Sequence, residues 1–324
     1  MAVIVVTGGC GFIGSNLVWT LVREGHQVRV LDTQPSLPTF HDPGTAALAK
    51  RVIHRVGDIR NIGACRSVMH GADAVVHLAA EAGVAPSIAD PLHNAEVNAT
   101  GTLNLLVTAR DAGVKRFVFA SSGAVLGAHR PPGDETTLCQ PISPYGASKL
   151  AGEAYCQAFT ASFGLSSASL RFSNVYGPGS LHKGSVVAEF CKRALAGGPL
   201  VIYGDGAQTR DFLYVGDLVR GITQCLEEPQ ATGIFHVCSG SPTTIAVLAR
   251  RIQQLSQADR ATPVAIEHKP ARSFEVRESY FANAKAHAAF GFAPAKAFEE
   301  GVEETWQWFL AQTAHRQAPV EFLA

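Results

Sequence analysis

Three side chains in the middle of the chain have the types and spacing for acid–base chemistry on an alcohol. Tyr145 and Lys149 are four residues apart in a helical stretch, so both project from one helix face. A phenol ionises near pH 10, and an ammonium group beside it stabilises the phenolate and lowers that value. Ser122 follows an apolar strand and offers a hydroxyl to the same substrate oxygen. We therefore expect these three residues to remove a proton from an alcohol.

Tyrosine and lysine at this spacing are common by chance, so the prediction needs independent support from a second motif. The first part of the chain provides such a motif. An apolar run (Val3–Val6) precedes a glycine pattern, and apolar positions at helical spacing (Leu17–Val22) follow it. The glycines are Gly8, Gly11 and Gly14. Glycine lets the backbone turn tightly and lets a diphosphate approach where a Cβ would collide, while a helix N-terminus attracts the phosphates. The pattern predicts a dinucleotide-binding unit that supplies a hydride acceptor.

The residues that follow favour NAD as the cofactor. We expect Ser15 to cap the helix and Gly25 to end it. A second strand (Val28–Leu31) then leads to Asp32, whose carboxylate binds ribose hydroxyls and repels the 2′-phosphate of NADP. Asp58 ends a third strand, where it can contact the adenine or cap the next helix, and the sequence favours neither role.

Strands and helices alternate along the first half of the chain. Further strands are predicted at residues 52–56, 74–80, 117–120 and 170–172, and helices at 100–112 and 144–163. We expect Asn98 to cap the first of these helices. In open α/β sheets ligands bind outside the carboxyl ends of the strands, so the strand-end residues should face one crevice. The predicted fold is α/β, a Rossmann-type doubly wound parallel sheet flanked by helices.

Beyond residue 172 the alternation loosens, which predicts a smaller α/β substrate domain. We expect residues 1–172 to bind the dinucleotide and residues 173–324 mainly to bind the substrate, with some segments returning to the first domain. Helices are predicted around residues 186–196, 246–255 and 299–311. No internal repeat or low-complexity linker separates the two parts, so they should interleave.

Composition excludes several classes of protein. The 324 residues are 47% hydrophobic and carry 27 basic and 27 acidic side chains, so no basic field favours nucleic acid. The seven cysteines include no Cys-x-x-Cys pair and predict reduced thiols of a cytoplasmic protein, with neither a disulfide framework nor a metal site. No apolar run approaches the length that spans a membrane, and we see no signal peptide.

Motifs along nearly the whole chain resemble one known family. They are Thr7–Gly14, His77–Ala80, Asn98–Thr102, Ser121–Ser122, Tyr145–Lys149, Asn174–Pro178, Tyr203–Gly206 and Arg210–Phe212. This set resembles the extended short-chain dehydrogenase/reductases, in particular the NAD-dependent nucleotide-sugar epimerases and dehydratases. Within that group it looks like the UDP-sugar 4-epimerases of the UDP-glucose/UDP-galactose type. That resemblance implies removal of hydride from carbon 4, rotation of a 4-keto sugar, and return of the hydride to the opposite face.

The resemblance also implies roles for individual residues. Catalysis would use Ser122, Tyr145 and Lys149. Cofactor contacts would come from Gly8, Gly11, Phe12, Ile13, Gly14, Asp32, Asp58, Ile59, Leu78, Ala79, Ala80, Asn98, Tyr145 and Lys149. Substrate contacts would come from Ser122, Tyr145, Asn174, Val187, Tyr203, Arg210, Arg272 and Glu275. Family members form homodimers through two helices of each subunit, which here match residues 100–112 and 145–163.

Departures from the family pattern bear on the reaction. Gly123 and Ala124 replace the acidic pair that 4,6-dehydratases carry, which disfavours dehydration. Phe274 replaces a glycine that usually follows the diphosphate arginine, and its effect is open. His182 and Lys183 lie in the loop beside the sugar pocket, where they would meet a uronate carboxylate or simply be solvated. The alternatives to a hexose 4-epimerase are a uronate epimerase or decarboxylase, a nucleotide-sugar dehydrogenase or reductase, and a catalytically idle dinucleotide-binding regulator.

Overall fold

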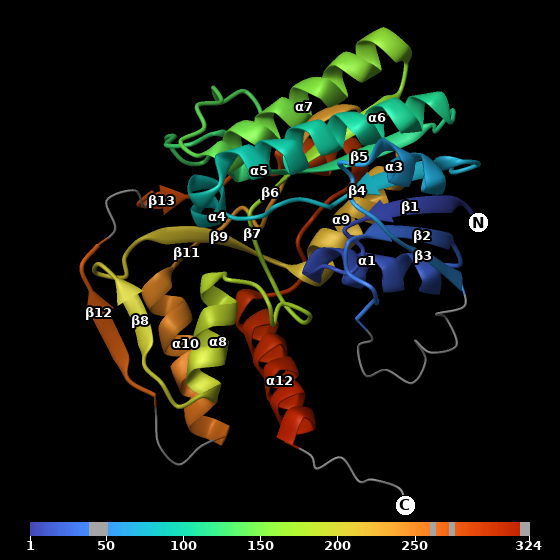
Figure 1. The fold of residues 1–324 in the computed structure, drawn as a ribbon. Coiled ribbons are helices and arrows are strands. Elements are labelled where there is room, and N and C mark those ends of the chain that lie inside the picture. Colours follow the sequence, from blue (N-terminus) through green and yellow to red (C-terminus); the bar gives the residue numbers. More distant parts are fainter. Residues whose placement is uncertain (39–50, 260–263, 272–275, 318–324) are drawn as a thin grey trace, which may run out of the picture.

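The computed structural model describes residues 1–38, 51–259, 264–271 and 276–317, and is built around one parallel sheet (Figure 1). In this part of the chain seven strands pair in the order β10-β6-β5-β4-β1-β2-β3. They are β1 (Val3–Thr7), β2 (Gln27–Asp32), β3 (Val52–Val56), β4 (Ala74–His77), β5 (Arg116–Ser122), β6 (Ser166–Phe172) and β10 (Gly233–Val237). All six pairings are parallel. The predicted doubly wound sheet is confirmed, and β10 joins its edge from far along the chain.

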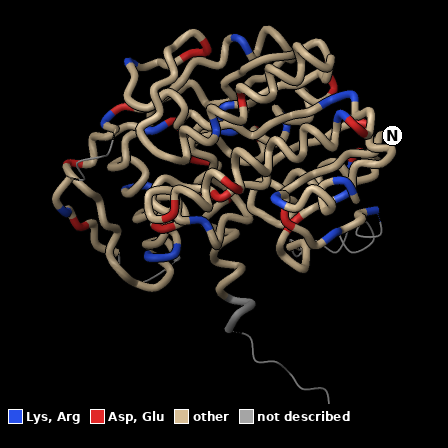
Figure 2. Tube along the Cα trace, turned by 45° about the horizontal axis from the view of Figure 1, so that its top comes forward, with Lys and Arg blue, Asp and Glu red and all other residues tan. Residues whose placement is uncertain are grey.

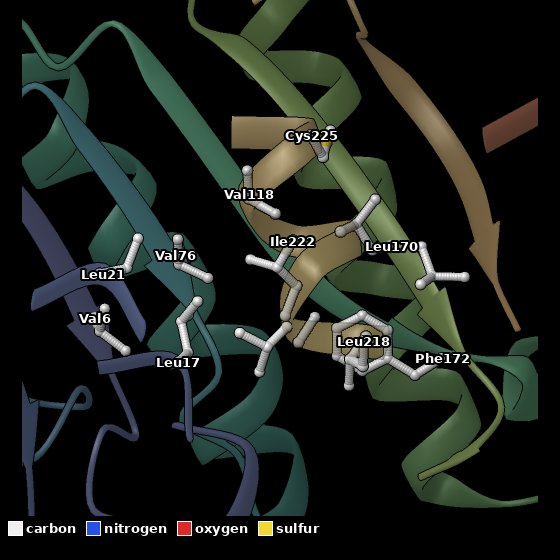
Figure 3. Close-up of a cluster of buried hydrophobic side chains, with 14 of the residues drawn as sticks. Val6, Leu17, Leu21, Val76, Val118, Leu170, Phe172, Leu218, Ile222 and Cys225 are labelled. Atoms are coloured by element: carbon white, nitrogen blue, oxygen red, sulfur yellow. The ribbon is translucent and has the colours of Figure 1, made fainter. Parts of the chain in front are cut away.

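Helices cover both faces of this sheet. One face carries α1 (Phe12–Arg23), α9 (Val215–Glu227) and α11 (Ala284–Phe290), and the other carries α3 (Ile62–Met69), α6 (Gly101–Asp111) and α7 (Pro144–Phe163). Figure 3 shows α1 and α9 contributing Leu17, Leu21, Leu218 and Ile222 to a core with Val6, Val76, Val118 and Leu170. Strands β1 and β4, at the centre of the sheet, are rich in valine and isoleucine and are buried on both faces.

The second half of the chain builds a separate hydrophobic core beside the sheet. Its helices are α8 (Val186–Leu195), α10 (Ile245–Asp259) and α12 (Phe298–Gln317). Its strands are β7 (Asn174–Tyr176), β8 (Leu200–Tyr203), β9 (Thr209–Tyr214), β11 (Pro242–Thr244), β12 (Ile266–Lys269) and β13 (Glu278–Ser279). Strands β7, β11 and β13 pair with β9, and β12 pairs with β8. Short helices α4 (Val84–Ala89) and α5 (Pro91–Ala95) follow β4.

Two predicted helix caps, Ser15 and Asn98, are wrong, and the capping role left open for Asp58 is excluded. The residue before α1 is Gly11, and Ser15 lies inside the helix, where its hydroxyl donates to the Phe12 carbonyl at 3.2 Å. Asn61, and not Asp58, caps α3 by accepting from two backbone N–H groups. Asn98 lies within a π-helical turn (Glu96–Thr100) that continues into α6, so it has no helix start to cap.

The charged side chains form no field of one sign in the described residues. Figure 2 shows Lys and Arg interspersed with Asp and Glu over the fold, in agreement with the equal totals of 27 each. Within the same residues no helix is both long and apolar enough to span a bilayer.

Candidate active site

A cleft of about 1640 Å³ runs along the carboxyl ends of the strands of the large sheet. Sites for one small ligand usually occupy about 300–1,000 Å³, so this cleft has room for two ligands. Sixteen residues with a predicted role line it: Gly8, Gly11, Phe12, Ile13, Gly14, Asp32, Asp58, Ile59, Leu78, Ala79, Ala80, Ser122, Tyr145, Lys149, Asn174 and Arg210. The topology thus brings together side chains that are up to 202 residues apart in the sequence.

The glycine loop leaves space that any side chain would fill. Gly8 has a φ of +71°, and a Cβ there would lie 2.6 Å from the Ala79 backbone nitrogen. A Cβ on Gly14 would lie 2.0 Å from the Gly8 carbonyl oxygen. No side chain caps the N-terminus of α1, so its first N–H groups are open to an anion. This arrangement fits the diphosphate of a dinucleotide.

Asp32 is held at the end of β2 with capacity for a further ligand. Its carboxylate accepts from the backbone N–H groups of Cys10 and Gln34, each at 2.9 Å. The Cys10 thiol also interacts with it through a side-chain hydrogen bond. A carboxylate has about four acceptor sites, so one remains for a ribose hydroxyl. The geometry is therefore compatible with NAD.

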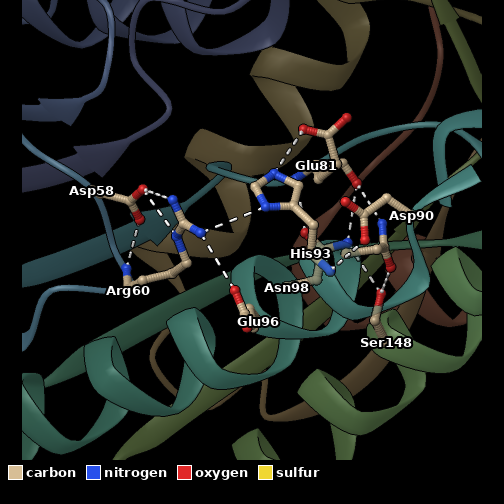
Figure 4. A network of polar contacts seen from close by, with 9 residues as sticks. Asp58, Arg60, Glu81, Asp90, His93, Glu96, Asn98 and Ser148 are labelled. Carbon is tan, nitrogen blue, oxygen red and sulfur yellow. Dashed lines mark hydrogen bonds and ion pairs between the residues drawn. The ribbon is translucent and has the colours of Figure 1, made fainter.

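The Asp58 carboxylate already forms an ion pair with Arg60. The Arg60 guanidinium donates to it at 2.7 and 3.0 Å, and this contact lowers the pKa of the Asp58 carboxyl. Figure 4 shows Arg60 also reaching toward His93 and Glu96. Asp58 therefore presents an ion-paired carboxylate to the cleft.

Asn98 is not part of the cleft lining, but it holds in place a backbone segment that is. Its amide oxygen accepts from the Glu81 N–H at 2.8 Å, and its amide nitrogen donates to the Glu81 carbonyl and the Ser148 hydroxyl, both at 3.0 Å (Figure 4). These bonds tie the segment after β4 to α7. The structure thus gives Asn98 a packing role between the backbone that lines the cleft and the helix that carries Tyr145.

The three residues predicted to be catalytic converge at one end of the cleft. Tyr145 lies in the first turn of α7, and Ser143 caps that helix by accepting from the Gly146 N–H at 3.1 Å. Ser122 ends β5 and interacts with the Tyr145 phenol through a side-chain hydrogen bond. The Lys149 amine donates to the Ala120 carbonyl at 2.9 Å and lies 5.9 Å from the centre of the Tyr145 ring.

Burial shifts both ionisable groups of this site. It raises the pKa of the Tyr145 phenol, while the hydrogen bond with Ser122 acts in the opposite direction. It lowers the pKa of the Lys149 amine to about 8. In the ligand-free protein the phenol is therefore protonated, and a further positive charge is needed to form the phenolate.

The residues predicted to bind substrate are only partly brought together. Asn174 and Arg210 line the cleft. Val187 is 1% exposed inside the core of the second half, and neither it nor Tyr203 is part of the cleft lining. The remaining two, Arg272 and Glu275, lie outside the described residues, as does Phe274.

Sequence reasoning missed Phe281, which lines the cleft beside Ser122. A Cβ on Gly123 would lie 2.2 Å from the Phe281 ring, so the glycine at this position makes room for that ring. The ring also stacks on His236, with centroids 5.0 Å apart. No local pattern indicates this contact, because 158 residues separate Gly123 from Phe281.

Comparisons with known proteins agree with this geometry. The family model of the NAD dependent epimerase/dehydratase family matches residues 4–238. A putative UDP-glucose 4-epimerase of Methanocaldococcus jannaschii is 34% identical over 310 residues, which are 94% of this chain and 97% of the relative.

Solved structures of similar proteins superpose over nearly the whole chain. The UDP-glucose 4-epimerase of Thermotoga maritima with UDP-glucose has a TM-score of 0.87 and 34% identity, covering 96% of this chain and 99% of that one. The UDP-glucose 4-epimerase of Thermus thermophilus with NAD has a TM-score of 0.84 and 33% identity, covering 95% and 99%. Similar relatives also include a UDP-glucuronate 4-epimerase and dTDP-glucose 4,6-dehydratases. This chain belongs to the NAD dependent epimerase/dehydratase family and is an enzyme that uses NAD.

Proposed function

We propose that this enzyme is a UDP-sugar 4-epimerase of the UDP-glucose/UDP-galactose type. The observation that carries the proposal is the shared location of Ser122, Tyr145 and Lys149 beside the glycine loop, in a cleft with room for a dinucleotide and a second ligand. Relatives that are named as UDP-glucose 4-epimerases support the choice of substrate. Arg210 and Asn174 line the same cleft and would bind the substrate diphosphate.

In this proposal Tyr145 moves the proton of the substrate 4-hydroxyl. NAD⁺ held by the glycine loop and Asp32 would supply the acceptor, and later the donor, of the carbon 4 hydride. Lys149 keeps a positive charge near the phenol, and Ser122 shares its hydrogen bond with the substrate oxygen. Because burial opposes ionisation of the phenol, the ligands themselves complete the base: the phenolate forms only when the cleft is loaded.

Dehydration is disfavoured by the residues next to Ser122. Elimination of water between carbons 5 and 6 needs an acid and a base, and Gly123 and Ala124 supply neither. Space is lacking as well, because the Phe281 ring occupies the volume that a side chain on Gly123 would need. We therefore place this chain with the epimerases rather than with the dehydratases of the family.

A UDP-glucuronate 4-epimerase is the second candidate. It is favoured by His182, a basic side chain in the cleft wall, and by a relative of that activity that is 30% identical. The two candidates are separated by incubating the enzyme with UDP-glucose, UDP-N-acetylglucosamine and UDP-glucuronate and reading the products by NMR. We expect a 4-epimer from UDP-glucose. No 4-epimer from any of the three would exclude 4-epimerase activity, and net production of NADH would indicate a dehydrogenase.

We further propose that the enzyme is a cytoplasmic homodimer that pairs through α6 and α7. Exposed aromatic side chains on α7, Tyr155 at 37% and Phe163 at 52%, are suited to such an interface. All seven cysteines are free, which suits a reducing compartment. Sedimentation equilibrium should give twice the 34.2 kDa chain mass, and a mass of one chain would refute the dimer.

A further inference from the structure

The amine of Lys183 is a cation in the cleft wall for which the described residues provide no carboxylate partner. Its Nζ donates one hydrogen bond, to the Val175 carbonyl at 3.0 Å, and lies 5.1 Å from the centre of the Phe12 ring. No acidic side chain pairs with it in the part of the chain that the structure describes. An ammonium group has three donors, so two are left for a ligand.

Its position relative to Phe12 indicates which ligand it faces. Phe12 is the first residue of α1, directly after the glycine loop, and the N-terminus of that helix has no side-chain cap. Two sources of positive charge, the helix terminus and the amine, therefore lie next to each other. An anion between them would be bound from both sides.

Hydrogen bonds fix the loop that carries Lys183 against α1. Asn16 of α1 donates to the Pro178 carbonyl at 3.0 Å, so the loop between β7 and α8 passes beside α1 (Figure 1). Within the loop, the Lys183 N–H donates to the Ser180 carbonyl at 2.9 Å. The Lys192 amine donates to the Lys183 carbonyl at 3.2 Å. These bonds fix the loop backbone at Lys183, while the Val175 carbonyl holds its ammonium.

Burial of this ammonium has a cost that a bound anion would offset. The surroundings lower the pKa of Lys183 to about 8, and the cause is loss of water alone. Salt-bridged lysines at the surface have no such cost, so the sequence keeps an unfavourable charge here.

We propose that the Lys183 ammonium binds the diphosphate of the bound dinucleotide, opposite the N-terminus of α1. In this role Lys183 adds a second cationic contact from the substrate-side half of the chain and closes the cofactor into the cleft. The proposal rests on the use of NAD, not on the identity of the sugar. It assigns Lys183 to the cofactor and not to a uronate carboxylate.

The test is calorimetric titration of the full-length chain with NAD, and of the NAD-loaded chain with UDP and UDP-glucuronate. Lys183→Met keeps the apolar stem and removes the charge. Lys115→Met is the matched control, because Lys115 is exposed and lies at the amino end of β5, whereas the cleft lies at the carboxyl ends of the strands. We expect Lys183→Met to weaken NAD binding by about 10- to 100-fold, as for loss of one charge-assisted hydrogen bond. Lys115→Met should change it less than twofold.

The affinities for UDP and UDP-glucuronate should stay within about twofold of wild type. NAD binding that is unchanged in Lys183→Met overturns the proposal, and so does a loss confined to UDP or UDP-glucuronate. If circular dichroism shows that Lys183→Met is misfolded, Lys183→Gln is titrated in the same way and judged by the same outcomes. The NAD titration remains informative even if the enzyme acts on a different sugar, so failure of this proposal is distinct from failure of the proposed function.

Discussion

Replacing Arg171 with methionine tests a buried ion pair that links β6 to α7, beside the end of β5 at Ser122. Arg171 on β6 makes two hydrogen bonds to the Glu153 carboxylate of α7, both at 2.8 Å, and the two side chains are 2% and 1% exposed. The Ser121 hydroxyl, on the residue before Ser122, donates to the same carboxylate. Arg171→Met removes the only cation that pairs with Glu153 among the described residues.

The expected loss of stability follows from the state of the Glu153 carboxylate in the variant. Left without its partner, the Glu153 carboxylate is buried with no cation beside it in the described part of the chain. Mutations that break buried ion pairs in this way cost about 3–5 kcal/mol, and we expect Arg171→Met to lose stability by this amount.

Urea unfolding of the full-length protein at pH 7, followed by tryptophan fluorescence, measures this loss. The double variant Glu153→Gln/Arg171→Met leaves no unpaired charge buried, so it should recover most of the lost stability. A loss below about 1 kcal/mol in Arg171→Met would refute the reasoning, as would a double variant no more stable than the single one.

Three further predictions concern the cofactor cleft. Gly14→Ala places a Cβ 2.0 Å from the Gly8 oxygen and must displace the glycine loop. NAD affinity measured by calorimetry should therefore fall at least about tenfold. Unchanged affinity would contradict the binding of the dinucleotide diphosphate at this loop. Asp32→Ser removes the charge that repels a 2′-phosphate, so the ratio of NADP to NAD affinity should rise about tenfold or more, and an unchanged ratio would be evidence against the role of Asp32. The buried Lys149 has a pKa of about 8 against an ordinary 10.5, so the unfolded chain binds more protons between these values, and the stability of the wild type should rise by up to about 3 kcal/mol across that window. Lys149→Met should lack this increment in urea unfolding at pH 8 and pH 10, and a rise equal to that of the wild type would refute the assignment.

The sequence predicts the bounds of a helix or strand well where residues within or next to that element determine them. The helix at residues 144–163 and the strand at residues 52–56 have the observed bounds. Pro144 starts the helix and Gly164 follows its end, and the strand has β-branched residues at three of its five positions. The end of the first helix near Gly25 is also correct, since that glycine has a φ of +92°.

The errors arise where tertiary structure decides. Serine, asparagine and aspartate favour caps on average, but Gly11 precedes α1, and Asn98 is used instead to join the Glu81 backbone to Ser148. Strand β10 is short and contains His236, so its sequence alone does not indicate a strand; it is stabilised by pairing with β6. Contacts such as Phe281 against Gly123 depend on the fold and leave no local pattern.

The candidate site shows the same division. The glycine loop, Asp32 and the Tyr145–Lys149 pair are set by spacing within single elements, and all of them line the cleft. The pKa shifts were less predictable: proximity of an ammonium suggests a more acidic phenol, whereas burial raises the pKa of Tyr145 in the ligand-free protein. Only the packing around the phenol reveals this, because desolvation depends on every element that surrounds it.

The central claim is that the Tyr145 phenol handles the substrate proton, and Tyr145→Phe tests it most directly. The variant is assayed with the UDP-sugar that the wild type converts, by NMR of the products, together with calorimetric titration with NAD. We predict that turnover falls about 10²- to 10⁴-fold while NAD affinity stays within about twofold of wild type. Turnover equal to that of the wild type would contradict the claim and exclude Tyr145 as the base.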